Sequence, residues 1–270
     1  MSLIDNSTGK FLYKYLPFNQ YSLQILINQK FWLGPPDLLN DPFEGDFIIK
    51  NFKKFHNKQC IETLIELTKS DSKYDVIFND YIYNELINDE DQFLNKLFEY
   101  LNIIIKKNYG TTSFSKRCDD LKMWSHYADS HKGFVIIFDR KILETTIVDG
   151  ITKLIDVEYN GLPSINLDYD SNNFNIRDYG MILTKKLSDW NNEDEVRIIK
   201  KHEFAYDFQR FLKFKRESIK GIIYGSRISF ENLMTIDNIL VNSNQDLKFY
   251  VGKKNSERNK IIFNEIIYKK

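Results

Sequence analysis

The chain has 270 residues, of which 42% are hydrophobic and 15% aromatic, so it can bury a sizeable core and does not have the composition of a disordered protein. Lysine plus arginine equals aspartate plus glutamate at 38 each, which gives a formal net charge of zero. Proteins that bind duplex nucleic acid through their overall field are normally basic, so this mode is disfavoured, whereas a local basic groove is still allowed.

Cysteine content and hydropathy indicate in which cellular compartment the protein is found. The two cysteines, Cys60 and Cys118, form no disulfide framework, and no CxxC pair indicates a zinc site. The first ten residues are polar and lack the pattern of a signal peptide, and no apolar run approaches the roughly 18 residues needed to cross a bilayer. We therefore expect a cytoplasmic protein with no membrane partner.

The pattern of apolar residues predicts one α+β domain, 1–270, built on a mixed central sheet. The first half begins with a strand at 11–15, a helix at 20–29 and a buried strand at 31–33 that Gly34-Pro35-Pro36 stops. Apolar residues at helical spacing from about 51 to 107, separated by many charges, predict a helical lobe inserted into the domain.

The second half is predicted to hold most of the sheet. The unbroken apolar run at 133–139 is typical of a central strand buried on both faces. Helices are predicted at 119–128 and 178–187. Further strands are predicted at 110–114, 154–159, 195–200 and 219–224, with edge strands at 247–251 and 260–269.

The segment Met123-Trp124-Ser125-His126-Tyr127 gathers side chains that can stack or form hydrogen bonds. On a helix, Trp124 and Tyr127 are three residues apart and share a face, which suits the floor of a site for a nucleobase or a nicotinamide ring. The alternative is that both aromatics are core residues and that His126 is a structural histidine. A serine hydrolase pair of His126 with a nearby serine lacks a Gly-x-Ser-x-Gly elbow, and nothing indicates a reactive thiol at Cys118.

A second polar segment runs from Trp190 to Ile199. If Glu195 opens a strand, Glu195 and Arg197 project to one face, where Arg197 can fix a carboxylate that is presented to a ligand hydroxyl. Glu193 lies two residues earlier, and its orientation is open. The alternative is a surface ion pair on an edge strand, which contributes little energy.

A third polar segment is Asn40-Asp41-Pro42-Phe43-Glu44. Asp41 and Glu44 are three residues apart, and together with Glu193 or Glu195 they would suit the metal site of a metal-dependent nuclease. The alternative is an N-cap with a compensating acidic residue in the first turn.

A basic run lies nearer the C-terminus. Lys213, Lys215 and Arg216 stand beside Phe211 and Phe214, where they either contact phosphates or form a solvated face.

In this order, these pieces resemble a bacterial family filed as domain of unknown function 2971. The resemblance rests on residues 12–15, 31–33, 40–44, 113–115, 123–129, 131–133 and 222–225, and on Lys186, Trp190, Glu193, Glu195, Arg197 and Ile198. It implies no activity. The family usually has a serine-rich strand end where this chain reads Phe31-Trp32-Leu33-Gly34-Pro35, so a hydroxyl function there is in doubt.

The order of residue types is also similar to that of ADP-ribosyltransferases. Those enzymes tend to have a basic residue or a histidine on an early strand, a hydroxyl or an aromatic residue on a middle strand and a glutamate on a later strand. Here Lys14 or Tyr15, Ser113 or Ser115, and Glu195 follow in that order. This resemblance implies NAD as the substrate. Glu195 would be the catalytic carboxylate, because in such enzymes it bonds the nicotinamide ribose and stabilises an oxocarbenium-like transition state.

The leading hypothesis is therefore an NAD-dependent ADP-ribosyltransferase or NAD glycohydrolase that acts as a toxin or phage-defence effector. The alternatives are a metal-dependent nuclease and a non-catalytic module that senses a ligand or a partner. The macromolecular target, protein or nucleic acid, is open. Candidate catalytic residues are Glu195, His126 and Tyr127; candidate NAD-binding residues are Lys14, Tyr15, Ser113, Ser115, Trp124 and Arg197; further candidates are Asn40, Asp41, Glu44, Trp190 and Glu193.

Overall fold

The computed structural model describes residues 3–4, 9–50, 95, 98, 102, 108–147, 152–166, 182–201, 207–241, 246–257 and 260–267. The helical lobe predicted at 51–107 lies outside the described residues, apart from helical positions at Asn95, Phe98 and Asn102. Within the described part of the chain, no helix is long and apolar enough to cross a membrane.

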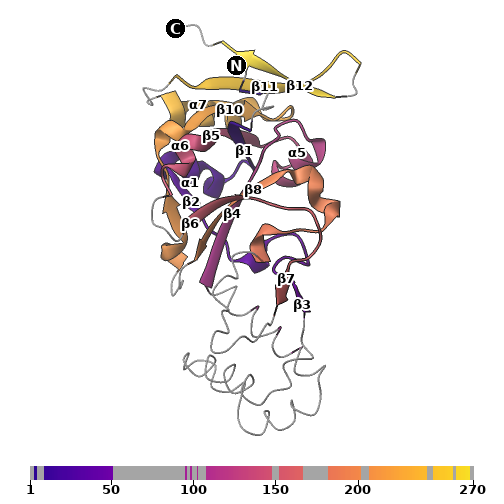
Figure 1. The fold of residues 1–270 in the computed structure, drawn as a ribbon. Coiled ribbons are helices and arrows are strands. Elements are labelled where there is room, and N and C mark those ends of the chain that lie inside the picture. The colour runs from indigo at the N-terminus through magenta and orange to yellow at the C-terminus, as the bar shows by residue number, and fades with distance from the viewer. Residues whose placement is uncertain are drawn as a thin grey trace, which may run out of the picture.

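An eight-stranded mixed sheet forms the centre of the molecule, in the order β12-β11-β10-β5-β1-β4-β8-β6 (Figure 1). Neighbouring strands are antiparallel except β10 and β11, which are parallel. The strands are β1 Phe11–Leu16, β4 Tyr109–Ser115, β5 Phe134–Asp139, β6 Thr152–Asp156, β8 Glu195–Lys201, β10 Ile219–Tyr224, β11 Lys248–Lys254 and β12 Ile261–Ile266. The predicted α+β class is confirmed. The C-terminal prediction holds in part, because β12 is an edge strand whereas β11 lies inside the sheet.

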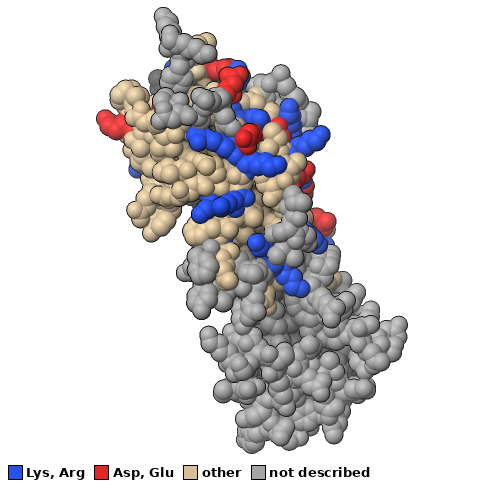
Figure 2. Space-filling view, turned by 90° about the vertical axis from the view of Figure 1, so that its left-hand side faces the viewer, with Lys and Arg blue, Asp and Glu red and all other residues tan. Residues whose placement is uncertain are grey.

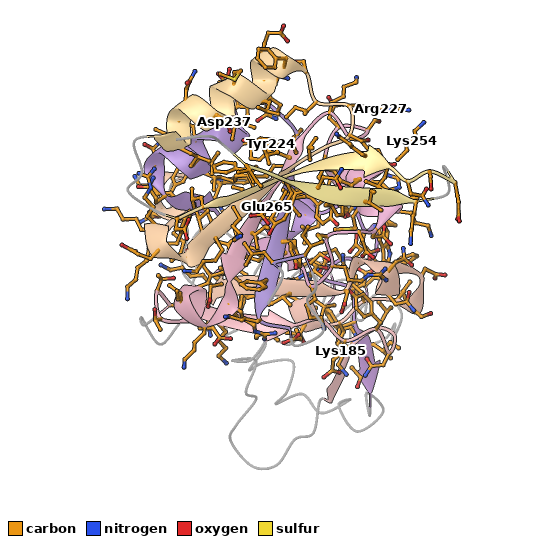
Figure 3. All side chains as sticks on the ribbon, turned by 90° about the horizontal axis from the view of Figure 1, so that it is seen from above. Lys185, Tyr224, Arg227, Asp237, Lys254 and Glu265 are labelled. Carbon is orange, nitrogen blue, oxygen red and sulfur yellow. The ribbon has the colours of Figure 1, made fainter. Side chains whose placement is uncertain are left out.

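Both faces of the sheet are covered. Helices α1 (Gln20–Asn28), α6 (Arg140–Glu144) and α7 (Phe230–Val241) contribute to the apolar cluster on one face, and α5 (Leu121–Tyr127) contributes to the cluster on the other. Every residue of β5 is buried, as its unbroken apolar run predicts. On the first face, the hydroxyl of Tyr224 on β10 donates a hydrogen bond to the carboxylate of Asp237 on α7, which ties this helix to the sheet (Figure 3).

Short elements complete the described chain. Strand β2 (Lys30–Trp32) pairs with β9 (Phe211–Lys213), and β3 (Ile48–Lys50) pairs with β7 (Ser164–Asn166). The 3-10 helices are η1 Pro36–Leu38, η4 Ser188–Glu193, η5 Asp207–Arg210 and η6 Arg216–Ser218.

The helix predicted at 178–187 is wrong for the residues that the structure describes. Residues 182–184 form a single 3-10 turn, and the chain then runs extended. Its backbone is bonded to Glu158, whose amide donates to the Thr184 carbonyl and whose carbonyl accepts from the Lys186 amide, both at 2.9 Å. These tertiary hydrogen bonds replace the local ones that a helix would need.

The sheet opens between β1 and β4. Six residue pairs join β1 to β5, whereas the two fully described strands β1 and β4 share one pair in register, Tyr13 with Ser115. The side chain of Lys14 occupies part of the opening, and its Nζ donates to the Ser113 carbonyl at 3.0 Å and to Thr112 Oγ1 at 2.7 Å. A carbonyl that the sheet ladder leaves free is thus satisfied by a lysine side chain.

Gly133, directly before β5, provides a test of how closely the chain packs against the end of β1. A Cβ at this position would lie 2.1 Å from the carbonyl oxygen of Leu16, so Gly133→Ala must move backbone. We expect it to lower the free energy of unfolding by about 1–3 kcal/mol in urea titrations. The control is Gly252→Ala, whose Cβ would meet a methyl of Ile261 at 3.2 Å, a side chain that can shift. Equal losses in the two variants would contradict this account.

Candidate functional site

A cavity of about 890 Å³ lies at the opening between β1 and β4. Its polar lining combines Lys14 and Ser113 from the sheet with Tyr127, Lys186, Glu193 and Glu195. Its apolar lining comes from α1, β2, η1, β4, α5 and β9, and includes Tyr21, Ile25, Trp32, Leu38, Leu39, Phe114, Met123 and Phe211. A concave site with apolar walls and a few convergent polar groups is the usual form of a small-molecule site.

Arg197 holds the charged side of this cavity together. It lies on β8 between β4 and β6 and is fully buried, so the expected alternative of a surface ion pair on an edge strand is wrong. Its Nη1 and Nη2 donate to Glu44 Oε1 and Oε2 at 2.5 and 2.8 Å, and its Nε and Nη2 donate to Glu195 Oε1 and Oε2 at 2.6 and 3.0 Å. Nη1 also donates to the Leu183 carbonyl at 2.7 Å. Two bidentate carboxylates thus share one guanidinium.

Lys186 extends the network towards Tyr127. Its Nζ lies 2.8 Å from Glu193 Oε2, 2.9 Å from Glu195 Oε2 and 3.9 Å from Glu44 Oε2. Tyr127 Oη donates to Glu193 Oε1 at 2.5 Å and accepts from Asn40 Nδ2 at 2.5 Å. The three polar segments that stand out in the sequence therefore meet in one network, which is buried at Arg197, Lys186, Glu195 and Glu193 and reaches the surface at Tyr127 and Asn40.

The two carboxylates on Arg197 differ in pKa for a geometric reason. Burial alone would raise the pKa of Glu195, but the charges of Arg197 and Lys186 outweigh it and hold this pKa at about 2. Burial raises the pKa of Glu44 and outweighs the opposing charges of Arg197 and of Lys186, which lies farther away at 3.9 Å. Glu195 is therefore a fixed anion near neutral pH. The stability from its lowered pKa is present above pH 4.5 and is lost as pH falls towards about 2.

Lys14 is a cation of the inner cavity wall that no described carboxylate neutralises by direct contact. Its hydrogen-bond acceptors are the neutral Thr112 hydroxyl and Ser113 carbonyl, and its Nζ lies 5.1 Å from the centre of the Phe114 ring. Burial lowers the pKa of Lys14 to about 8, despite the opposing effect of Glu195.

Several predicted residues lie around the cavity but have structural partners. Tyr15 lines it and donates its hydroxyl to the Arg117 carbonyl at 2.9 Å. Ser115 Oγ donates to the Glu193 carbonyl at 2.7 Å, which fixes the turn before β8. Ser113 hydrogen-bonds Glu195. Asp41 accepts from the Phe43 amide at 2.9 Å, so it closes its own turn.

The structure does not bring the remaining candidates to the cavity. Trp124 is core: its ring meets Tyr15 edge to face at 5.3 Å, and its Nε1 donates to the Cys118 carbonyl at 2.7 Å. His126 is exposed on the outer side of α5. Trp190 receives Lys186 Nζ over its ring at 5.2 Å, behind the cavity lining. Burial raises the pKa of the Cys118 thiol to about 12, which disfavours a thiolate nucleophile.

The sequence analysis did not identify Lys186 as a site residue. It also did not identify Trp32 and Phe211, which lie at the apolar rim of the cavity. Lys186 stands in the motif shared with the family, but nothing in its spacing from Glu195 shows that it reaches three glutamates. In the sequence, nothing distinguishes Trp32 and Phe211 from other aromatic residues. Their pairing is visible only once β2 and β9 are seen to meet.

The carboxylates do converge, as a shared metal site would need, but two cations already occupy the space among them. Within the described residues, no group of three or more His, Cys, Asp or Glu side chains is placed to hold a metal ion. A divalent ion at this point would have to displace the buried ammonium of Lys186.

The fold and the site define an α+β protein with a buried ionic network beside an open cavity. Residues 123–198 match the model of the family described as "Protein of unknown function (DUF2971)". The match confirms the family resemblance, over a segment that includes Tyr127, Lys186, Glu193, Glu195 and Arg197. No curated protein and no solved structure matches the chain. The similarity to ADP-ribosyltransferases stays a prediction.

Replacing Arg197 tests the network. Arg197→Leu leaves Glu44 and Glu195 buried without their guanidinium, and we expect a loss of about 3–5 kcal/mol in the free energy of unfolding at pH 7. The deficit shrinks at acidic pH, because protonation removes the unpaired charges. Arg140→Leu is the control: it removes pairs to the more exposed Glu144 and Asp156 and costs about 1 kcal/mol or less. A deficit for Arg197→Leu that does not change with pH contradicts the assignment.

Proposed function

We propose that the cavity binds NAD and that the protein is an enzyme that breaks its nicotinamide–ribose bond, as an ADP-ribosyltransferase or an NAD glycohydrolase. The observation that carries the proposal is one carboxylate, Glu195, held ionised at the wall of a cavity of about 890 Å³, with a lysine on the same wall, Lys14, that forms no ion pair with a described carboxylate. Cleavage of NAD would lower the NAD content of a cell. This is the basis for the proposed role as a toxin or phage-defence effector.

The lining suits a ligand with flat rings and anionic groups. Tyr127 supplies aromatic surface in the inner lining for a nicotinamide or an adenine ring. Lys14 supplies a positive charge for a phosphate, because its hydrogen-bond partners are neutral.

Glu195 would act as an electrostatic stabiliser. Cleavage breaks the bond between ribose C1′ and the ring nitrogen, and the bonding pair leaves with nicotinamide and neutralises its pyridinium charge. The ribose is left with oxocarbenium character, which a fixed neighbouring carboxylate stabilises. Water or an acceptor group then adds to C1′ and loses its proton to solvent. With a pKa of about 2, Glu195 is too weak a base to take that proton.

One observation favours the alternative of a non-catalytic ligand sensor. Arg197 donates to both oxygens of Glu195, and Lys186 lies 2.9 Å from one of them, so much of the hydrogen-bonding capacity of this carboxylate is used internally. A site of this kind can bind a ligand without turning it over. The experiment below separates the two functions.

The test compares two glutamates on the same guanidinium. Glu195→Gln removes the charge at the cavity, and Glu44→Gln removes a carboxylate from Arg197 at a position outside the cavity lining. We expect nicotinamide release from NAD by the wild type, a loss of about 100-fold or more in Glu195→Gln, and a much smaller loss in Glu44→Gln. Thermal unfolding of both variants reports on the fold.

The outcomes are distinct. Equal losses in the two variants would mark Glu195 as a support for the network. NAD binding by the wild type without nicotinamide release would favour the sensor, and no binding at all would overturn the proposal.

Lys14 gives the site a pH dependence. An anion bound at Lys14 needs the ammonium form, so affinity for NAD is constant well below pH 8 and falls as pH rises through about 8. We expect a loss of about tenfold between pH 7 and pH 9 by calorimetry. Lys14→Met should bind more weakly at pH 7 and show no such decline. A decline of the same size in Lys14→Met would assign it to another group.

A further inference from the structure

The rim of the cavity carries an unusual pair of strands. In the β2–β9 ribbon, Lys30 stands directly opposite Lys213, and Trp32 stands directly opposite Phe211. Because side chains alternate along a strand, these four residues share one face of the ribbon, and Phe31 and Leu212 point to the core on the other. Lys30, Trp32 and Phe211 also line the cavity.

The lysine pair is costly unless an anion is bound. Like charges directly opposite each other on paired strands destabilise a sheet. Neither Lys30 nor Lys213 pairs with a described carboxylate within ion-pair distance. The basic run continues from Lys213 to Lys215 and Arg216. Lys and Arg side chains gather across the middle of the face that Figure 2 turns to the viewer, the side on which α1 and β2 lie in Figure 1.

The aromatic pair is exposed at the same place. Trp32 is 42% exposed and Phe211 is 50% exposed, and Tyr21 and Leu38 extend the apolar rim. The Trp32 ring packs against Gly34: a Cβ at Gly34 would lie 3.0 Å from the ring. The backbone at Gly34 therefore holds the ring in place. Supported aromatic rings beside cationic side chains are the elements with which proteins hold unpaired bases and their phosphates.

We propose that the exposed face of the β2–β9 ribbon binds single-stranded nucleic acid, with bases stacked on Trp32 and Phe211 and phosphates at Lys30 and Lys213. The strand passes the open rim of the cavity. The proposal deepens the proposed function, on which it rests for the identity of the acceptor: Lys30, Trp32 and Phe211 line the same cavity as Glu195, so a bound strand would present its nucleobases and sugars to the site that holds NAD.

A single strand fits better than a duplex or a protein. Stacking needs bases that are free of a partner, which a duplex does not offer. The zero net charge is not that of a general duplex binder, whereas two opposed lysines form a local phosphate site. A protein partner would have to supply carboxylates to the facing lysines and an apolar surface to the aromatic rings, whereas each nucleotide supplies an anion and a ring together.

The binding test needs no NAD. Fluorescence anisotropy with a labelled single-stranded oligonucleotide of mixed sequence compares the wild type with Lys30→Glu/Lys213→Glu, and the salt dependence is measured for both. We expect at least a tenfold loss of affinity and a salt slope lower by about two, one for each phosphate contact. The matched control is Lys122→Glu/Lys132→Glu, which changes the charge equally at exposed positions around α5 on the other side of the sheet. It should change affinity less than about twofold.

The aromatic part is tested separately. Trp32→Ala should weaken binding by about tenfold, and Trp32→Phe should restore most of it, because a phenyl ring still stacks. Inorganic polyphosphate, which has charges and no bases, should compete poorly. Equal loss in both charge variants, polyphosphate binding as tight as the oligonucleotide, or no oligonucleotide binding by the wild type at low salt would overturn the proposal.

Failure of this inference is distinguishable from failure of the proposed function. Nicotinamide release by the wild type without oligonucleotide binding removes the nucleic-acid acceptor and leaves the NAD activity in place. Oligonucleotide binding without any NAD binding or cleavage does the reverse.

Discussion

The buried guanidinium of Arg197 is the interaction on which the site depends. An unpaired charge in the interior costs several kcal/mol, so Arg197 requires carboxylates, and it draws Glu44 and Glu195 to bidentate contacts. Lys186 then balances Glu193 and the rest of Glu195. Glu44 lies in the turn at 41–46, Glu193 ends η4 and Glu195 begins β8, so the network fixes that turn, the end of η4 and the start of β8 relative to one another. The position of Glu195 at the cavity wall is a consequence of this balance.

The second constraint is the incomplete pairing of β1 with β4. If β1 and β4 were hydrogen-bonded along their whole length, there would be no space between them. Because they share one residue pair, an opening is left that side chains line. Lys14 satisfies a free carbonyl there and keeps a positive charge in a largely buried place. The lowered pKa of Lys14 and the lowered pKa of Glu195 have opposite origins: burial dominates at Lys14, and two neighbouring cations dominate at Glu195.

These two constraints place positive and negative side chains in different parts of the site, although the charges of the whole chain sum to zero. Glu44, Glu193 and Glu195 lie deep and close to buried cations, whereas Lys14 and the two lysines of the β2–β9 ribbon form no ion pair with a described carboxylate. A net charge of zero therefore hides a cavity whose open side carries lysines and aromatic rings and whose inner wall holds carboxylates that are paired with buried cations. That division is what a ligand with phosphates, rings and a developing positive charge on a ribose would need.

The sequence by itself indicated the strands of the central sheet but not the short strands β3, β7 and β9, because the pattern of apolar and polar residues is a local property that is clearest in the longer strands. It predicted β5 as a buried central strand and placed Glu195 and Arg197 on one face of β8. It did not determine that Trp124 is core while its helical neighbour Tyr127 reaches Glu193, or that 182–186 runs extended. Only the tertiary structure decided which charges meet, since Glu44 and Arg197 are 153 positions apart and no periodic pattern encodes that distance. The paired lysines and aromatics of β2 and β9 were hidden for the same reason: each strand is unremarkable alone, and their chemistry arises where the two lie side by side.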